Sequence, residues 1–132
     1  MTDDEEDREE VLYRGTTYDA AQKVFAQKCF EIRETHFASS RELAEYFAVR
    51  SCGKRSGASH PAVIRVVLYE SDLRLWKRNK YVRSTDFSEG DRPELRGKTQ
   101  LIFSAEGMRF LNTYMFPADL RVEQIDRANP LT

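Results

Sequence analysis

One run of apolar, largely β-branched residues constrains the fold of this chain more than any other feature. From Ala62 to Tyr69, five of the eight residues are Val, Ile or Leu, and Arg65 is the only charge among them. A short run of this composition favours a strand that is buried on both faces, near the centre of a sheet. With 132 residues, the chain has room for one compact domain. We therefore expect a single domain built around a sheet.

The N-terminal half predicts a strand and two helices. Residues 11–16 form an extended run, and the threonines after Gly15 can cap a helix. Residues 18–29 predict that helix, because apolar side chains recur at steps of three and four. Ser39 and Glu42, three residues apart, indicate a capping box, with a second helix starting near Ser40.

The C-terminal half predicts further strands separated by polar segments. Residues 71–98 form a long polar stretch with anchors for one short helical turn, and Thr99 to Phe103 form a strand. A glycine-containing connection through Glu106 and Gly107 leads to extended runs at 114–116 and 120–125. Helices and strands do not alternate as regular βαβ units. This pattern favours an α+β domain with a largely antiparallel sheet.

The formal charges almost cancel, with 21 basic residues against 22 acidic ones, but they are unevenly placed. Residues 1–10 hold seven acids and one arginine, a net charge of −6. The other 122 residues hold 20 basic and 15 acidic residues, a net charge of +5. A dense run of like charges cannot bury enough apolar surface to become ordered. We expect an acidic disordered tail over residues 1–10 and one domain over residues 11–132.

Composition also argues against several classes of protein. No apolar run approaches the roughly 20 residues of a membrane helix, and no basic and apolar leader opens the chain. Cys29 and Cys52 stand apart, without a CxxC motif or a Cys/His cluster. We expect a cytoplasmic protein with no membrane contact, disulfide framework or metal site.

Common catalytic signatures such as GxGxxG, the Walker-type loop, HExxH and the nucleophile elbow are absent. Residues suited to chemistry fall in three segments, 12–16, 35–48 and 98–103. Each also has a purely structural interpretation, as a surface arginine, a helix cap, a core aromatic or a polar strand residue. Only their joint occurrence in this order favours a functional site.

Taken together, the three segments resemble the three motifs of ADP-ribosyltransferases of the Arg-Ser-Glu type. They contain Tyr-Arg-Gly on a first strand, Phe-x-Ser-Ser before a helix with x-x-x-Ala-x-x-Phe-Ala, and a polar residue that opens a late strand. The resemblance runs from about Leu12 to Ile125. It implies a split, mainly antiparallel sheet with two or three flanking helices and NAD in the cleft. The implied activity is that of a toxin- or effector-like glycosyltransferase with NAD as co-substrate.

The resemblance also implies roles for individual residues. Arg14 would pair with the NAD phosphates, because a guanidinium matches phosphate oxygens. The Gly15 backbone would hold the nicotinamide amide, Ser39 would position the third-motif residue and the ribose, and Phe37 or Tyr46 would pack against the nicotinamide. The implied catalytic residues are Arg14, Ser39 and Gln100. The implied NAD-binding residues are Tyr13, Arg14, Gly15, Thr16, Phe37, Ser39 and Tyr46.

Gln100 departs from the family, which usually has glutamate there to hold the ribose 2′-hydroxyl and stabilise the oxocarbenium-like state. An amide lacks the negative charge, which would slow the reaction by roughly two or more powers of ten. A natural variant, a lost activity and an engineered Glu→Gln change all remain open explanations. Glu94 and Glu106, which flank the strand, are the alternative carboxylates.

The segment from Arg74 to Arg83 supports a hypothesis from a different class. It holds five cations and no acids, with Trp76 and Tyr81 among them. Cations for phosphates and aromatics for base stacking favour a non-catalytic nucleic-acid-binding module, and a solvated loop is the plain alternative. In a transferase, the segment would border a protein or nucleic-acid acceptor. An inhibitory protein such as an antitoxin is a further expected partner.

Overall fold

The computed structural model describes residues 8–53, 60–88, 93–114 and 121–124. Some expectations lie outside the described residues, namely most of the acidic tail, the centre of the segment after the second helix, and residues 115–116, 120 and 125 of the two expected extended runs. Within the described residues, 121–124 form a strand as predicted, whereas Tyr114 ends a helix and is not part of an extended run.

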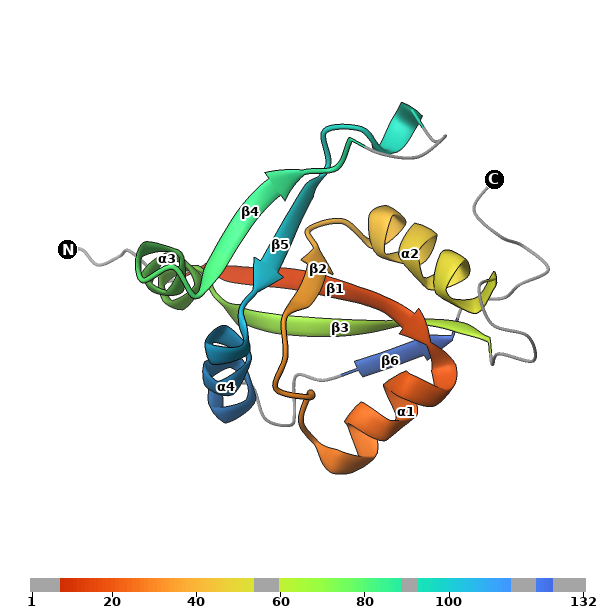
Figure 1. The fold of residues 1–132 in the computed structure, drawn as a ribbon, viewed down its shortest axis with the longest axis horizontal. Coiled ribbons are helices and arrows are strands. Elements are labelled where there is room, and N and C mark those ends of the chain that lie inside the picture. The colour runs from red at the N-terminus through yellow and green to blue at the C-terminus, as the bar shows by residue number, and fades with distance from the viewer. Residues whose placement is uncertain (1–7, 54–59, 89–92, 115–120, 125–132) are drawn as a thin grey trace.

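In the part of the chain that the structure describes, six antiparallel strands form one sheet in the order β4-β5-β2-β1-β3-β6 (Figure 1). In chain order they are β1 (Glu9–Thr17), β2 (Thr35–Ala38), β3 (Pro61–Tyr69), β4 (Val82–Asp86), β5 (Thr99–Phe103) and β6 (Arg121–Gln124). The predicted α+β class with an antiparallel sheet is confirmed.

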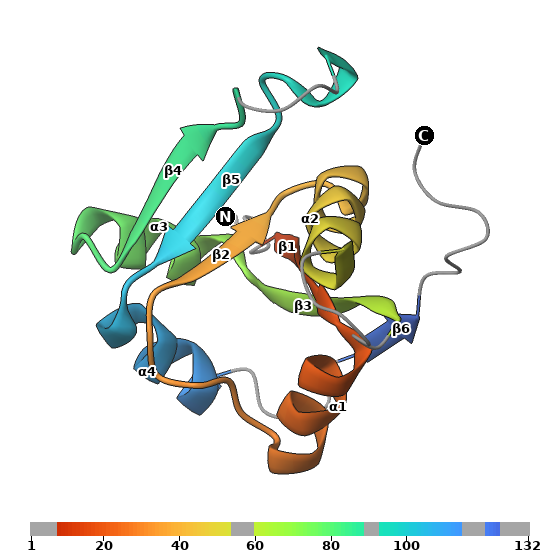
Figure 2. The same cartoon turned by 45° about the vertical axis from the view of Figure 1, so that its right-hand side comes forward.

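The sheet is almost divided between β1 and β2. Strand β1 pairs with β3 along its whole length, from Glu9 opposite Tyr69 to Thr17 opposite Pro61. It pairs with β2 only where Tyr13 lies opposite Ala38. Figure 2 shows the β4-β5-β2 strands crossing the direction of the β1-β3-β6 strands. We call this narrow junction between the two three-stranded halves the seam.

Strand β1 begins two residues earlier than the sequence predicted. Glu9 and Glu10 lie opposite Tyr69 and Leu68 of β3, so these two acids belong to the sheet and not to the tail. The backbone hydrogen-bond ladder therefore extends into the acidic run, although the sequence there does not predict a strand.

Within the described ranges, four α-helices and one 3-10 turn join the strands, where two or three helices were predicted. They are α1 (Tyr18–Gln27), α2 (Arg41–Gly53), α3 (Glu70–Arg78), η1 (Pro93–Leu95) and α4 (Ala105–Tyr114). None of the helices in the described ranges is long and apolar enough to cross a lipid bilayer.

The starts of α1 and α2 are fixed by hydroxyl caps. Thr17 Oγ1 accepts a hydrogen bond of 3.2 Å from the Ala20 N–H, as the sequence predicted. At α2, Ser40 Oγ accepts a hydrogen bond of 3.2 Å from the Leu43 N–H. The predicted capping box of Ser39 with Glu42 is wrong, because Ser39 Oγ donates to a carbonyl of β5 instead.

Two helices occupy segments that were predicted to be irregular. Helix α3 and strand β4 fill much of the stretch interpreted as a long polar loop, because Leu73 and Trp76 anchor the helix to the core. Helix α4 replaces the expected glycine-containing connection. Gly107 lies inside α4, and a Cβ there would be only 2.5 Å from the carbonyl oxygen of Tyr81. This glycine permits close packing of α4 and does not end it.

Apolar side chains fill both faces of the sheet. Helix α2 covers one face, and α1 and α4 lie on the other (Figure 1). Along β3, Val63 packs in the cluster beneath α2, whereas Ile64 and Val66 pack in the cluster on the opposite face. The prediction of an internal strand buried on both faces is therefore confirmed for residues 62–66, whereas Tyr69 at the end of the strand is exposed.

Candidate functional site

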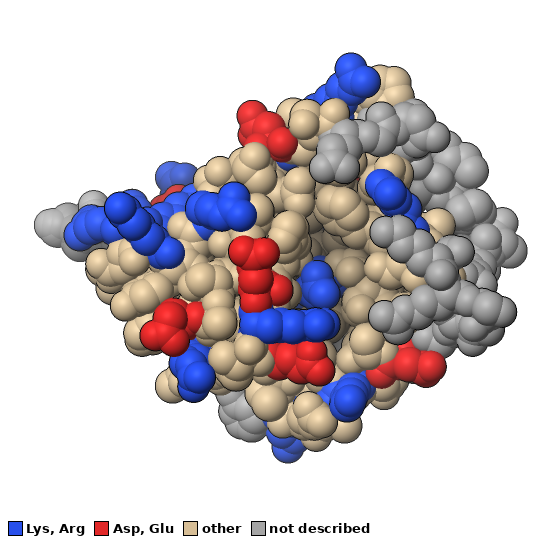
Figure 3. Space-filling view, in the orientation of Figure 1, with Lys and Arg blue, Asp and Glu red and all other residues tan. Residues whose placement is uncertain are grey.

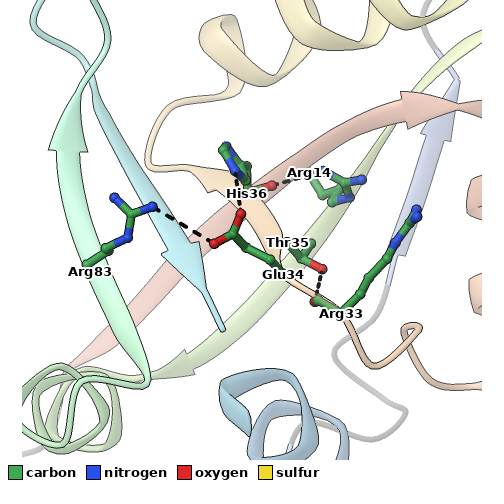
Figure 4. Close-up of polar contacts among 6 residues, drawn as sticks. All are labelled: Arg14, Arg33, Glu34, Thr35, His36 and Arg83. Atoms are coloured by element: carbon green, nitrogen blue, oxygen red, sulfur yellow. Dashed lines mark hydrogen bonds and ion pairs between the residues drawn. The ribbon is translucent and has the colours of Figure 1, made fainter. Parts of the chain in front are cut away.

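Arg14 lies at the seam and contacts β2 across it. The ladder between the two strands stops after Tyr13 and Ala38, so the His36 carbonyl further along β2 is not paired with β1. The Nη1 of Arg14 donates a hydrogen bond of 3.1 Å to this carbonyl (Figure 4). The guanidinium thus joins the two halves of the sheet where backbone pairing ends.

Two cavities meet at Arg14, each with a volume of about 330 Å³. The α1 cavity lies between α1, the end of β1 and the segment before β2, and its lining includes Arg14, Thr16, Asp19, Lys23, Glu31 and Arg33. The α2 cavity lies between α2, β1 and β2, and its lining includes Tyr13, Arg14, Gly15, His36, Phe47 and Arg50. Figure 3 shows the surface hollowed in this region.

The charge of Arg14 is held in a partly dehydrated, positively charged setting. Burial lowers the pKa of Arg14 from its usual value, nearby Arg33 lowers it further, and Glu31 opposes the effect. Arg33 Nε itself lies 3.0 Å from Glu31 Oε1, and its side chain rises beside Arg14 (Figure 4). Because arginine keeps its proton in proteins, an anionic ligand would stabilise this group.

The structure brings Ser39 and Gln100 together at the end of β2. Gln100 lies opposite Ala38, which lies opposite Tyr13, so one row of the sheet runs from β5 to the seam. Ser39 Oγ donates a hydrogen bond of 3.1 Å to the carbonyl of Thr99, beside Gln100. Residues in one row project from the same face, here the α2 face. Neither Ser39 nor Gln100 lines the α1 cavity or the α2 cavity.

Three other predicted ligand-binding residues do line the cavities. Tyr13 and Gly15 belong to the α2 cavity, and Thr16 belongs to the α1 cavity. Gly15 has a packing role as well. A Cβ at this position would collide with the Ala44 carbonyl oxygen and lie 2.8 Å from the Ala48 nitrogen of α2. Glycine is therefore required for α2 to pack against β1.

The two aromatic residues expected beside the ligand are instead parts of the core. Phe37 is 1% exposed and packs edge-on against Phe103 at a centroid distance of 5.1 Å. Tyr46 is 8% exposed, and its hydroxyl accepts a hydrogen bond of 3.2 Å from Arg50 Nη1. Neither ring lines the α1 cavity or the α2 cavity. Phe47, one residue after Tyr46, is the aromatic side chain of the α2 cavity that packs from the helix.

The two alternative carboxylates lie away from the predicted geometry. Strand β5 ends at Phe103, so Glu106 is not on the strand but in the first turn of α4. There its Oε1 lies 3.3 Å from Arg109 Nε. Glu94 is exposed in η1. Glu106 is therefore excluded as a carboxylate on the β5 row.

Several polar residues of the site had no signal in the sequence. His36, Arg33 and Arg50 line the cavities, yet they were part of no predicted role and meet Arg14 only through the fold. Glu34 Oε1 lies 3.8 Å from His36 Nε2, and Glu34 Oε2 lies 3.9 Å from Arg83 Nη2 (Figure 4). A line of polar contacts therefore runs from the α2 cavity to β4.

The expected stacking platform in the basic segment is not formed by Trp76. This ring is 7% exposed and packs in the core, with its centroid 6.2 Å from that of Phe103. Tyr81 is half-buried and lies against Phe110, at a centroid distance of 4.9 Å. The prediction that these rings stack on bases is wrong for Trp76, because its faces are covered.

No family model, curated protein or solved structure matches this chain. Among the residues that the structure describes, no three His, Cys, Asp or Glu side chains gather as a metal site.

Proposed function

We propose that the chain is an NAD-dependent ADP-ribosyltransferase that binds NAD across the seam. One observation carries this proposal: Arg14 is shared by two cavities of similar volume. A dinucleotide has the matching form, with two nucleoside halves joined by a diphosphate. The guanidinium would bind the diphosphate, and each cavity would receive one nucleoside.

The α2 cavity suits the nicotinamide half. It contains Tyr13, Gly15 and Phe47, so one ring can pack against nicotinamide while the backbone holds its amide. It also includes Ala38, next to Gln100 in the sheet row. Gln100 would hydrogen-bond the ribose 2′-hydroxyl, and Ser39 would fix the β2 end beside it through Thr99.

The reaction would break the bond between ribose C1′ and the nicotinamide nitrogen. The nitrogen keeps the bonding electron pair and nicotinamide leaves neutral, while a nucleophile of a macromolecular acceptor forms the new bond to C1′ and loses its proton. Positive charge develops on the ribose in between. Because Gln100 is uncharged, we expect tight binding of NAD but slow turnover.

The division of the sheet also supports the proposal. The resemblance implies a split sheet with NAD in the cleft, and the two halves here share a single backbone pair at the seam. Arg14 stands at this point and bonds to β2. A ligand on Arg14 would therefore contact both halves.

Calorimetric titration with NAD tests the proposal. We expect wild-type protein to bind NAD, Arg14→Ala to lose binding, and Arg109→Ala, which removes an exposed arginine from α4, to bind like wild type. Nicotinamide release, followed by chromatography, should rise by roughly two powers of ten in Gln100→Glu. Absence of NAD binding by the wild-type protein, or undiminished binding by Arg14→Ala, would overturn the proposal.

A further inference from the structure

Five exposed cations gather where α3 turns into β4. We call Arg74, Lys77, Arg78, Lys80 and Arg83 the basic cluster. In Figure 3, Lys and Arg side chains collect over α3 and the adjoining end of β4. The cluster is built by the fold, because residues on a helix, a turn and a strand contribute to it.

Core packing holds the basic cluster in place. Leu73 and Trp76 fix one side of α3 in the core, which turns its cationic residues outward. Lys80 adopts a left-handed conformation with φ 66°, and the Tyr81 N–H donates a hydrogen bond of 2.9 Å to the Trp76 carbonyl. This turn leads directly into β4, where Val82 is buried. The positions of the charged side chains are therefore set by an ordered backbone.

Three members of the cluster surround a concavity. Lys77, Lys80 and Arg83 line it together with Val82 and Ser84, and its volume is about 440 Å³. Ammonium, guanidinium and hydroxyl groups all donate hydrogen bonds to phosphate oxygens. Arg74 and Arg78 extend the positive charge beyond this concavity, which favours a ligand that carries more than one phosphate.

Little acidic charge neutralises the cluster. Arg83 Nη2 lies 3.9 Å from Glu34 Oε2, and both side chains are exposed. The other four members form no ion pair within the described part of the chain. Of the other acids in these elements, Glu70 and Asp72 lie in the first turn of α3, on the N-terminal side of Arg74, and Asp86 lies at the end of β4. Arg74, Lys77, Arg78 and Lys80 are therefore available to bind an anion.

We infer that the basic cluster binds the phosphate backbone of a nucleic acid. The ligand is a chain of phosphates and not a stacked base, because Trp76 is buried and Tyr81 packs against Phe110. A nucleic acid is favoured over an acidic protein because the five cations follow one another within ten residues from α3 to β4, and a nucleic acid carries a negative charge on every nucleotide. Recognition through phosphates is independent of base sequence.

The cluster adjoins the proposed NAD site. Glu34 contacts Arg83 on one side and His36, which lines the α2 cavity, on the other (Figure 4). A nucleic acid on the cluster would therefore lie beside the α2 cavity and would be the acceptor of ADP-ribose. This last step rests on the proposed function, whereas the binding itself does not.

Fluorescence anisotropy of a labelled single-stranded oligonucleotide of about 20 nucleotides tests the inference. If three phosphates are bound, affinity should fall about 20-fold between roughly 50 and 200 mM salt. The variant Lys77→Gln/Lys80→Gln should bind at least about tenfold more weakly, with a salt slope smaller by about 0.7 for each cation removed. Two oligonucleotides of unrelated sequence should bind with similar affinity.

The matched control is Arg96→Gln/Arg109→Gln, which removes the same charge outside the cluster. It should bind like wild type, and Arg14→Ala should also keep full affinity, which separates this test from that of the NAD site. If the control variant binds the oligonucleotide as weakly as Lys77→Gln/Lys80→Gln does, net charge alone explains the loss of affinity and the inference is overturned. No binding at low salt, or equal affinity for a polyglutamate peptide, would overturn it as well.

Discussion

Arg14 is half-buried at the seam, and a second arginine, Arg33, lies near enough to lower its pKa. Its lowered pKa means that the protonated guanidinium is less favourable in the folded chain than in the unfolded one. At neutral pH both states are protonated, so the full unfavourable contribution is present. One hydrogen bond to His36 offsets part of it. Such a charge is typical of a residue retained for a ligand.

Arg14→Met therefore separates binding from stability. Methionine has a similar length, fills the space at the seam and removes the desolvated charge. We expect the free energy of unfolding in urea to stay the same or to rise by up to about 1 kcal/mol, while NAD binding is lost. Destabilisation of about 2 kcal/mol or more would instead identify Arg14 as a structural tie between β1 and β2.

Gly15 lies both beside the α2 cavity and beneath helix α2, so its lack of a side chain could serve a ligand or the packing of the helix. The sequence singled it out for close approach to a ligand, and it does line the α2 cavity. Its missing side chain, however, is where the backbone of α2 lies, against Ala44 and Ala48. Packing alone therefore accounts for glycine at this position.

Gly15→Ala should destabilise the protein by about 3 kcal/mol, because the added methyl group meets backbone atoms that cannot move independently. Gly97→Ala is the matched control. A Cβ there has no neighbour within 4 Å, although its φ of 83° strains any other residue. The control should cost only about 1 kcal/mol. If chemical denaturation shows the same loss of unfolding free energy for Gly15→Ala and Gly97→Ala, then α2 shifts easily away from β1.

At the scale of helices and strands, predictions succeeded where one element carries its own pattern. The run at 62–69 and the spacing over 18–29 correspond to β3 and α1. Helix α3 was predicted only as one short helical turn, because its two buried residues, Leu73 and Trp76, lie three residues apart and mark a single turn of a helical pattern. Helix α4 was missed because Gly107 suggested a break. The group that requires a glycine at position 107 is the carbonyl of Tyr81, which lies in a distant part of the sequence.

The same distinction holds for the candidate site. Arg14 was found because it lies in a local motif. Phe47, Arg33 and His36 were not, because their relation to Arg14 depends on how α2 and the segment before β2 fold onto β1. Phe37 was misassigned because strand alternation does not show which face of β2 becomes core.

The start of α2 gives a prediction for two adjacent serines. Ser40→Ala should lower the free energy of unfolding by about 1 kcal/mol, because it removes the acceptor for the Leu43 N–H. Ser39→Ala should change it by less than about 0.5 kcal/mol. Ser39 is exposed, and its N–H keeps a bond of 3.0 Å to the Thr99 carbonyl when the hydroxyl is removed. Urea denaturation of both variants measures the difference, and the reverse order would restore Ser39 as the cap.

At the scale of the whole molecule, the acidic N-terminal segment joins the fold at the start of α3, where the Glu70 N–H donates a hydrogen bond of 2.8 Å to the Arg8 carbonyl. Residues 1–7 hold five acids and no cationic side chain. The Debye length is about 30 Å at 0.01 M salt, so we predict that these acids compete at low salt with a phosphate ligand of the basic cluster.

Removal of residues 2–7 should therefore raise the affinity for an oligonucleotide severalfold at low salt, with the difference shrinking as the Debye length falls to about 8 Å near physiological ionic strength. The deletion stops before Glu9, because β1 begins there and a longer deletion would remove strand pairs with β3. Replacing the five acids with their amides, at full length, should have the same effect if charge is the cause. Unchanged affinity in both variants, measured by anisotropy, would show that the acidic residues do not reach the basic cluster.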